Sequence, residues 1–286
     1  MCYYSNNNGI IAQGMYQMKA VSGLGKESRK QLTKVLRATT GTISVPQAAN
    51  ILNLPSLKTA KLLWGWNERG WVSRVKRGVY IPVPLEAESP DLSLEDPWII
   101  AEKLYSPCYV GGWSAAEYWG LTEQIFRTVV VMTTRKPRNR KANIKGTDFL
   151  LRTVSPKAMF GLSPVWRGQV KVAVSDPART IIDMLDNPRL GGSMRAIVDI
   201  LRNYLKSATN GSARLIGYAI QLGNSAVFKR LGFLLESLAP EETEAITTCL
   251  RNMKLGKVKF DPDLESSKLV TRWRLWVPKN WKQVKK

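Results

Sequence analysis

The strongest constraint on this chain is the spacing of helix starts and stops near its N-terminus. Ser44 can cap a helix and Pro46 suits a helix's first turn, so one short helix is predicted to begin there. Pro55 stops that helix, Ser56 is predicted to cap a second one, and Gly70 ends it. Two short helices joined by a turn of about four residues are typical of a helix-turn-helix.

A β-hairpin is predicted directly after the second helix. Residues 71–74 have strand character, residues 76–78 suit a tight turn, and residues 79–81 suit the returning strand. Apolar residues also recur at helical spacing over residues 27–38. A helix, a helix-turn-helix and a hairpin in this order predict a winged helix-turn-helix over residues 28–84.

The charge of the chain predicts an anionic partner. The 286 residues include 43 Lys and Arg against 22 Asp and Glu, which gives a formal charge of +21. Residues 1–84 alone hold 12 basic and two acidic side chains. A charge of this size favours nucleic acid first and an anionic membrane second. The sequence has no apolar run of about 18 residues, so we expect no membrane partner.

The remaining chain predicts a second, larger domain. Residues 85–96 are acidic and contain Pro and Ser, as linkers often do, and residues 1–27 are expected to form a flexible tail. Residues 97–286 mix strand-like runs with helical patterns. We therefore expect an α+β protein with an N-terminal winged helix-turn-helix and a larger mixed α/β C-terminal domain. Strands are expected near 128–132, 149–154, 170–174 and 273–277, and helices near 97–105, 113–119, 176–185, 193–206, 213–222, 226–238 and 241–252.

The second predicted helix carries the candidate base-reading residues. In a helix-turn-helix, the N-terminal half of this helix enters the major groove of DNA and meets the base edges. A period of about 3.6 residues turns Ala60, Leu63 and Trp66 toward the domain core. The side chains left exposed can bond base edges or touch a thymine methyl group. These base-reading candidates are Ser56, Lys58, Thr59, Lys61 and Leu62.

Further cations are predicted to bind phosphates. Those of the first helix share one face, and those of the hairpin surround its turn. The phosphate candidates are Lys30, Lys34, Arg37, Arg74, Lys76 and Arg77. The alternative for each of these lysines and arginines is an ordinary solvated surface. Trp64, Trp66 and Trp71 are expected in the core rather than as platforms for base stacking.

A second basic run is predicted to form a loop in the C-terminal domain. It consists of Arg135, Lys136, Arg138, Arg140 and Lys141. Two alternatives stay open for this possible second contact surface. It either contacts phosphates, RNA or a protein partner, or it is a solvated loop.

The residue types of the chain exclude several chemistries. Histidine is absent, which excludes Ser or Cys catalysis through a His base and His-ligated zinc sites. Cys2, Cys108 and Cys249 are too dispersed for a convincing zinc site or a disulfide framework, and they fit a reducing, cytoplasmic compartment. We therefore expect no catalytic residue, no cofactor and no metal.

Five stretches follow one another in a specific order. They run over Ala48–Tyr80, Tyr109–Gln124, Ser175–Asp183, Lys229–Leu235 and Arg272–Trp273. In this order they resemble the AbiEi family of antitoxins from bacterial abortive-infection toxin–antitoxin systems. The resemblance covers about residues 28–277, and the later stretches are more specific than the common hairpin motif. This chain departs from the family pattern at Trp119, where a His is expected.

The resemblance implies a function for each domain. The N-terminal domain would bind double-stranded operator DNA, with inverted repeats in the protein's own promoter, and so repress its own operon. The C-terminal domain would counteract a cognate nucleotidyltransferase-type toxin, not necessarily through a stable complex. Both activities belong to phage defence in the cytoplasm.

Two of these stretches also permit an interpretation from the residues alone. Ser175 or Asp176 can cap the helix that follows, and Arg179 and Asp183 are spaced to form an ion pair within it. Scaffolding is therefore the expected role of this pair. Lys229 and Arg230 stay open between contact with a partner and an ordinary solvated surface.

Three alternatives to an antitoxin remain from the sequence. One is a DNA-binding regulator without antitoxin activity, and another is an adaptor whose winged helix binds protein. The third is a DNA-processing enzyme such as a nuclease, which needs an acid followed later by acid-x-Lys. Its nearest match is Asp148 with Gln169-Val170-Lys171, where Gln is a poor substitute for a carboxylate at a Mg²⁺ site.

Overall fold

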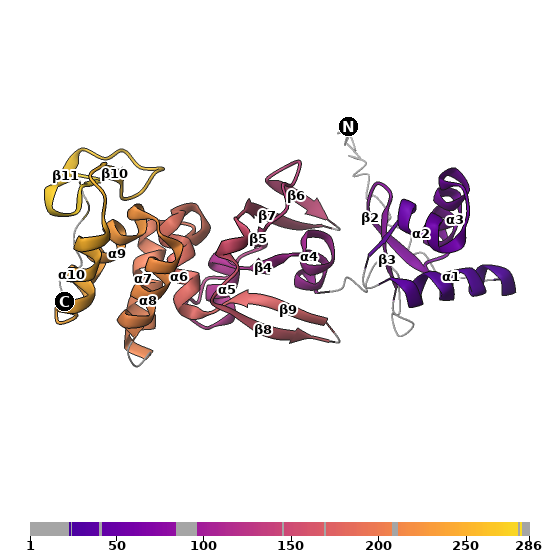
Figure 1. The fold of residues 1–286 in the computed structure, drawn as a ribbon, viewed down its shortest axis with the longest axis horizontal. Helices are drawn as coiled ribbons and strands as arrows, with labels where there is room; N and C mark the ends of the chain where they lie inside the picture. The colour runs from indigo at the N-terminus through magenta and orange to yellow at the C-terminus, as the bar shows by residue number, and fades with distance from the viewer. Residues whose placement is uncertain are drawn as a thin grey trace, which may run out of the picture. The chain divides into compact units, whose positions relative to one another are not determined.

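A computed structural model shows a mixed α+β protein whose chain divides into two units, residues 1–94 and 95–286 (Figure 1). The division falls inside the stretch predicted to be a linker. Most of that stretch, and residues 1–22 of the predicted tail, lie outside the described residues. The structure describes residues 23, 25–39, 42–83, 96–144, 146–168, 170–207, 211–279 and 281.

The N-terminal unit combines three helices with a small antiparallel sheet. The strand order is β1-β3-β2, and β2 and β3 form a hairpin. The elements are α1 (Lys26–Ala38), β1 (Ile43–Ser44), α2 (Val45–Leu52), α3 (Ser56–Glu68), β2 (Val72–Lys76) and β3 (Val79–Pro82). The predicted helices and hairpin are therefore confirmed, within a residue or two at their ends.

Local interactions explain where α2 begins and ends, whereas α3 begins without a side-chain cap. The Ser44 hydroxyl accepts a bond of 3.3 Å from the backbone N–H of Gln47, which confirms the predicted cap of α2. Asn53 ends that helix in the left-handed conformation, with φ of 54°. The predicted cap of α3 is wrong, because Ser56 already belongs to the helix and Pro55, which has no side-chain donor or acceptor, precedes it.

The core of the N-terminal unit joins all three helices to the sheet. Val35 of α1, Leu63 and Trp66 of α3, and Val72 of β2 are buried together. The Trp66 indole N–H also donates a bond of 2.8 Å to the Ser28 hydroxyl, which ties α3 to α1. This packing fixes which face of α3 is turned away from solvent.

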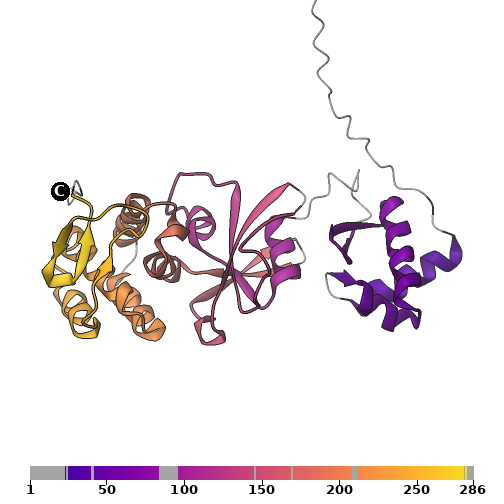
Figure 2. The same cartoon turned by 90° about the horizontal axis from the view of Figure 1, so that it is seen from above.

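The C-terminal unit is built on a six-stranded mixed sheet of order β6-β7-β5-β4-β9-β8. Figure 2 shows α4 on one face of this sheet and α5 and α6 on the other. The sequence predicted β5, β7 and β9, whereas β4, β6 and β8 were not expected. The elements are α4 (Pro97–Tyr105), β4 (Cys108–Val110), α5 (Gly112–Tyr118), β5 (Thr128–Thr133), β6 (Lys141–Ile144), β7 (Thr147–Thr153), η1 (Pro156–Ala158), β8 (Leu162–Arg167), β9 (Val170–Ser175) and α6 (Pro177–Asp186).

The last third of the chain is mainly helical and shares its apolar core with α6. It ends in a small sheet of order β10-β12-β11. The predicted helices are all present here. The elements are η2 (Pro188–Gly191), α7 (Met194–Ser207), α8 (Gly211–Leu222), α9 (Ser225–Leu238), α10 (Thr243–Asn252), β10 (Val258–Lys259), β11 (Lys268–Val270), η3 (Thr271–Trp273) and β12 (Leu275–Val277).

A buried polar network anchors α6 against the sheet. Asp176 caps the helix by accepting a bond of 2.8 Å from the Arg179 backbone N–H. The Arg179 and Asp183 side chains form the expected ion pair at 2.9 Å, and the Tyr109 hydroxyl donates to Asp183 at 3.0 Å. Burial raises the pKa of the Asp183 carboxyl more than the Arg179 guanidinium lowers it. Both side chains are buried inside the unit, as the expected scaffolding role requires.

Candidate nucleic-acid interface

Helix α3 exposes one ridge and buries the opposite one. Thr59, Leu63 and Trp66 follow each other at helical spacing and are at most 1% exposed. The opposite ridge carries Leu57, Lys61 and Trp64, with Leu57 73% and Trp64 57% exposed. Lys61 therefore projects from a ridge whose other large side chains are apolar.

The prediction is wrong for two of the base-reading candidates, which do not lie on the exposed face of α3. Thr59 is wholly buried, and its hydroxyl donates to the Pro55 carbonyl at 3.1 Å, so it has no surface to offer a base. Leu62 is half-buried and packs on the core of the N-terminal unit. The predicted helix phase put Ala60 inside, whereas the helix turns Thr59 inward instead. Ser56, Lys58 and Lys61 are exposed, as expected.

The hairpin presents its cations next to this ridge. Arg74, Lys76 and Arg77 are all exposed. The backbone N–H of Arg74 donates 2.8 Å to the Asn67 side chain, which fixes the start of the hairpin to the end of α3. Gly78 closes the turn with φ of 74°, a conformation that favours glycine.

A groove of 430 Å³ lies between α3 and the hairpin. It brings three of the predicted DNA-contacting residues together, since Lys61, Arg74 and Arg77 all line it. The remaining lining residues are Val45, Leu57, Ala60, Trp64, Gly78 and Tyr80. The site therefore has an apolar floor and cations along it, which suits an anionic ligand with apolar surface.

The cations of α1 do not line this groove. Lys30, Lys34 and Arg37 are exposed along one face of that helix, as predicted. They form a separate basic stripe of the N-terminal unit.

Leu57 and Trp64 were not among the predicted contacts. Trp66 lies in the core, as expected, but Trp64 faces solvent. The spacing of Leu57, Lys61 and Trp64 was readable in the sequence as a second stripe. The helix carries apolar residues on both faces, so spacing alone could not decide which face the domain covers.

The second basic run forms an exposed segment at one edge of the large sheet. It runs from the end of β5 into the edge strand β6, which begins at Lys141, so the predicted loop holds for its first four cations only. The five cations of this segment, Arg135, Lys136, Arg138, Arg140 and Lys141, are all exposed. We call it the basic edge segment.

The family-like stretches of the C-terminal unit lie mainly in its interior. The Trp119 indole donates 2.7 Å to the Ser175 carbonyl, which joins the second stretch to the third. Arg230 is buried and donates to the carbonyls of Leu185, Lys259 and Phe260 at 2.7–3.1 Å. Lys229 is also buried and donates to the Gly256 carbonyl. Both expectations for this pair are therefore wrong, because the two side chains are neither solvated nor available to a partner.

The residues considered for a nuclease site are not assembled. Asp148 and Lys171 both lie near the start of their strands, β7 and β9. Strands β5 and β4 separate these strands, and the pairings make β7 and β9 antiparallel, so the two residues lie at opposite ends of the sheet. Gln169 lies outside the described residues. Among those residues, no three Cys, Asp or Glu side chains are grouped closely enough to hold a metal ion.

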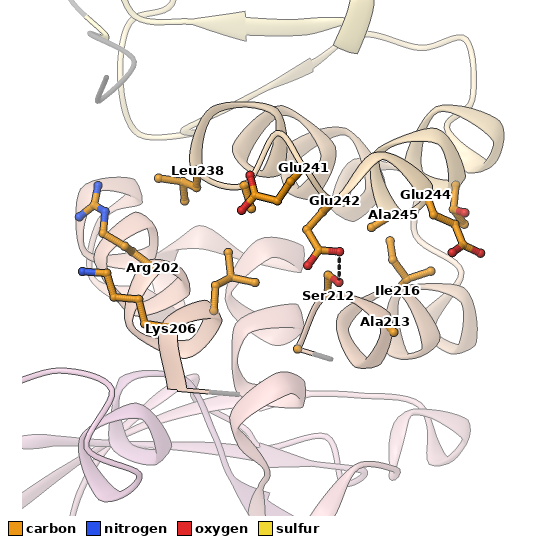
Figure 3. Close-up of a pocket in the computed structure, with 14 residues that line it drawn as sticks. Arg202, Lys206, Ser212, Ala213, Ile216, Leu238, Glu241, Glu242, Glu244 and Ala245 are labelled. Carbon is orange, nitrogen blue, oxygen red and sulfur yellow. Dashed lines mark hydrogen bonds between the residues drawn. The ribbon is translucent and has the colours of Figure 1, made fainter. Parts of the chain in front are cut away.

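A cleft of 580 Å³ opens in the helical part of the C-terminal unit (Figure 3). Arg202 and Lys206 of α7 line one side, and Glu241 and Glu242 line the other (Figure 3). The Ser212 hydroxyl donates 2.6 Å to the Glu242 carboxylate. The carboxylates make the cleft a poor site for a phosphate group.

None of the protein-family models compared with this chain matches it, and no curated protein matches it. Within the parts of the chain that the structure describes, every helix is too short or too polar to cross a membrane.

Proposed function

We propose that this protein is a DNA-binding autorepressor with antitoxin activity, whose N-terminal unit is a winged helix-turn-helix. The observation that carries the DNA-binding part is the groove between α3 and the hairpin. There Lys61 of the helix and Arg74 and Arg77 of the hairpin converge on one surface. Such cations neutralise phosphates, which supplies much of the affinity of DNA-binding proteins.

The mode of binding follows from the positions of these side chains. The first turn of α3 would enter the major groove, where Ser56 and Lys58 meet base edges. The sugar–phosphate backbone beside the groove would lie along α3 and the hairpin, within reach of Lys61, Arg74 and Arg77. Lys76 at the hairpin would contact the next phosphates or the minor groove.

The antitoxin part rests on the resemblance to the AbiEi family. The motifs that carry the resemblance in the C-terminal unit pack inside it, so they support a shared scaffold and do not identify a contact surface. The basic edge segment and the cleft of α7, α8 and α10 are two exposed features that would be open to contact with a partner. The toxin proposed to be counteracted is of the nucleotidyltransferase type.

The DNA-binding proposal is tested with the full chain and its own upstream region. We expect a gel shift and a footprint over inverted repeats, and a lower affinity for scrambled duplexes by about 10³-fold or more at physiological salt. The variant Lys61→Ala/Arg74→Ala/Arg77→Ala should lose binding while it keeps its thermal unfolding midpoint. Equal affinity for specific and scrambled duplexes would contradict sequence-specific repression.

The antitoxin proposal is tested separately in cells. The proposal expects a nucleotidyltransferase gene next to this one. That gene should arrest growth when expressed alone, and the full chain should relieve the arrest. The triple variant that loses DNA binding should still protect cells from the toxin, if the two activities belong to different units. Arrest that persists with the wild-type chain would leave a DNA-binding regulator without antitoxin activity.

A further inference from the structure

The geometry of α3 points to Leu57 as the residue that reads a thymine methyl group in the bound duplex. This inference rests on the proposed DNA binding and adds a specificity-determining residue to it. It replaces Leu62, which the sequence suggested for apolar base contact and which packs on the core instead.

Leu57 lies outside the apolar core of the N-terminal unit, so its side chain does not stabilise the fold by burial. It is the second residue of α3 and is 73% exposed, whereas Leu63 of the same helix is fully buried. An exposed apolar side chain contributes favourable free energy only when a partner covers it and removes it from water. The first turn of the second helix is the part of a helix-turn-helix that reaches base edges.

The surroundings of Leu57 define the chemistry of that partner. Lys58 and Lys61 flank it on the helix, and Arg74 and Arg77 line the same groove. This set of cations favours a polyanion over an apolar protein surface. On the major-groove edges of unmodified DNA, the apolar group is the C5 methyl of thymine, and the other features are hydrogen-bond donors and acceptors that Leu cannot use.

Trp64 supplies a matched comparison on the same ridge. It is also apolar and exposed, and it lines the same groove, but it lies two turns further along α3. The C-terminal part of this helix is turned away from the base edges, so Trp64 is expected to pack against sugars of the backbone. Trp64 should therefore contribute affinity without distinguishing thymine from uracil.

The experiment removes one methyl group at a time from the DNA. The full chain first selects its site from a random duplex library, and each thymine of that site is then replaced by deoxyuridine. At one position of each half-site, we expect the wild type to bind uracil about fourfold more weakly, which corresponds to one buried methyl group. Leu57→Ala should bind the thymine and uracil duplexes equally, and Trp64→Ala should keep the fourfold ratio while it binds both more weakly.

Three results separate this inference from the proposed function. A thymine-over-uracil ratio that survives in Leu57→Ala would overturn it, and so would a wild type that is indifferent to every uracil substitution. Absence of any sequence preference in the wild type would instead overturn the proposed sequence-specific DNA binding. Leu57 is exposed, so Leu57→Ala should unfold at the same temperature as the wild type.

Discussion

Gly232 of α9 lies so close to the Trp273 ring that a Cβ atom at position 232 would overlap it. The ring cannot easily move aside, because Trp273 is fully buried and its indole N–H donates 2.6 Å to Glu236. Gly232 therefore acts as a contact point, where the end of the chain packs onto α9. This contact joins the last two family-like stretches in space.

We expect Gly232→Ala to destabilise the C-terminal unit by about 1–3 kcal/mol or more, because overpacking forces the ring or the helix to shift. Gly217→Ala is the matched control, since a Cβ atom at position 217 of α8 meets nothing within 4 Å. That control should be neutral or stabilising by up to about 1 kcal/mol through helix propensity. Urea unfolding measures both, and equal effects would refute the contact.

Breaking the buried pair Arg179–Asp183 should lower the free energy of unfolding much more than breaking an exposed ion pair. Asp183→Leu leaves the buried guanidinium without its partner and should cost about 3–5 kcal/mol. The double variant Arg179→Met/Asp183→Leu should cost clearly less than Asp183→Leu alone, because neither charge remains buried. Asp199→Ala breaks the exposed pair with Arg202 and should cost at most about 1 kcal/mol. Chemical unfolding of the four proteins checks the order.

Two adjacent residues of α3 should behave differently toward DNA. Lys58→Ala should weaken binding by about 1–3 kcal/mol and relax the preference for one base pair, because Lys58 is exposed on the first turn. Thr59→Val should leave the preference unchanged, because the Thr59 side chain is buried and bonded to Pro55. Competition between duplexes that differ at single positions measures both. A relaxed preference in Thr59→Val would contradict the burial of that side chain.

Substitution of Arg77 should change the salt dependence of DNA binding. Arg77→Ala should reduce the slope of log affinity against log salt by about 0.9 if the residue neutralises one phosphate. Arg251→Ala removes the same charge from an exposed site at the end of α10, outside the groove. Its slope should match that of the wild type. Titrations at several salt concentrations distinguish a local contact from an effect of net charge.

Ionisation of the Tyr218 hydroxyl at high pH should reduce the stability of the protein. Burial and the hydrogen bond from its hydroxyl to Asp176, 2.6 Å long, raise its pKa from 10.0 to about 12. The folded state thus favours the neutral phenol, so this contribution is complete below pH 10 and is lost as the pH rises to about 12. Tyr218→Phe should be less stable than the wild type at pH 8, and the gap should narrow above pH 10. A constant gap across this range would show that the hydroxyl does not titrate in this way.

Features that depend on neighbours in the chain could be predicted from the amino-acid sequence. Ser44 caps α2 and Asp176 caps α6, because each bond joins residues three apart and needs no distant partner. The hairpin turn at Gly78 is local in the same way. The concentration of cations near the N-terminus is likewise a property of the sequence alone.

The surface that α3 exposes depends on packing between distant parts of the chain, so the sequence could not predict it. Leu57 and Trp64 on one face are as apolar as Leu63 and Trp66 on the other, so the spacing fits either orientation. Packing of Trp66 against α1 and the sheet settles it, turns Thr59 inward and leaves Leu57 in solvent. The contact of Gly232 with Trp273 is of the same kind, because it joins residues far apart in the chain whose meeting depends on the whole fold.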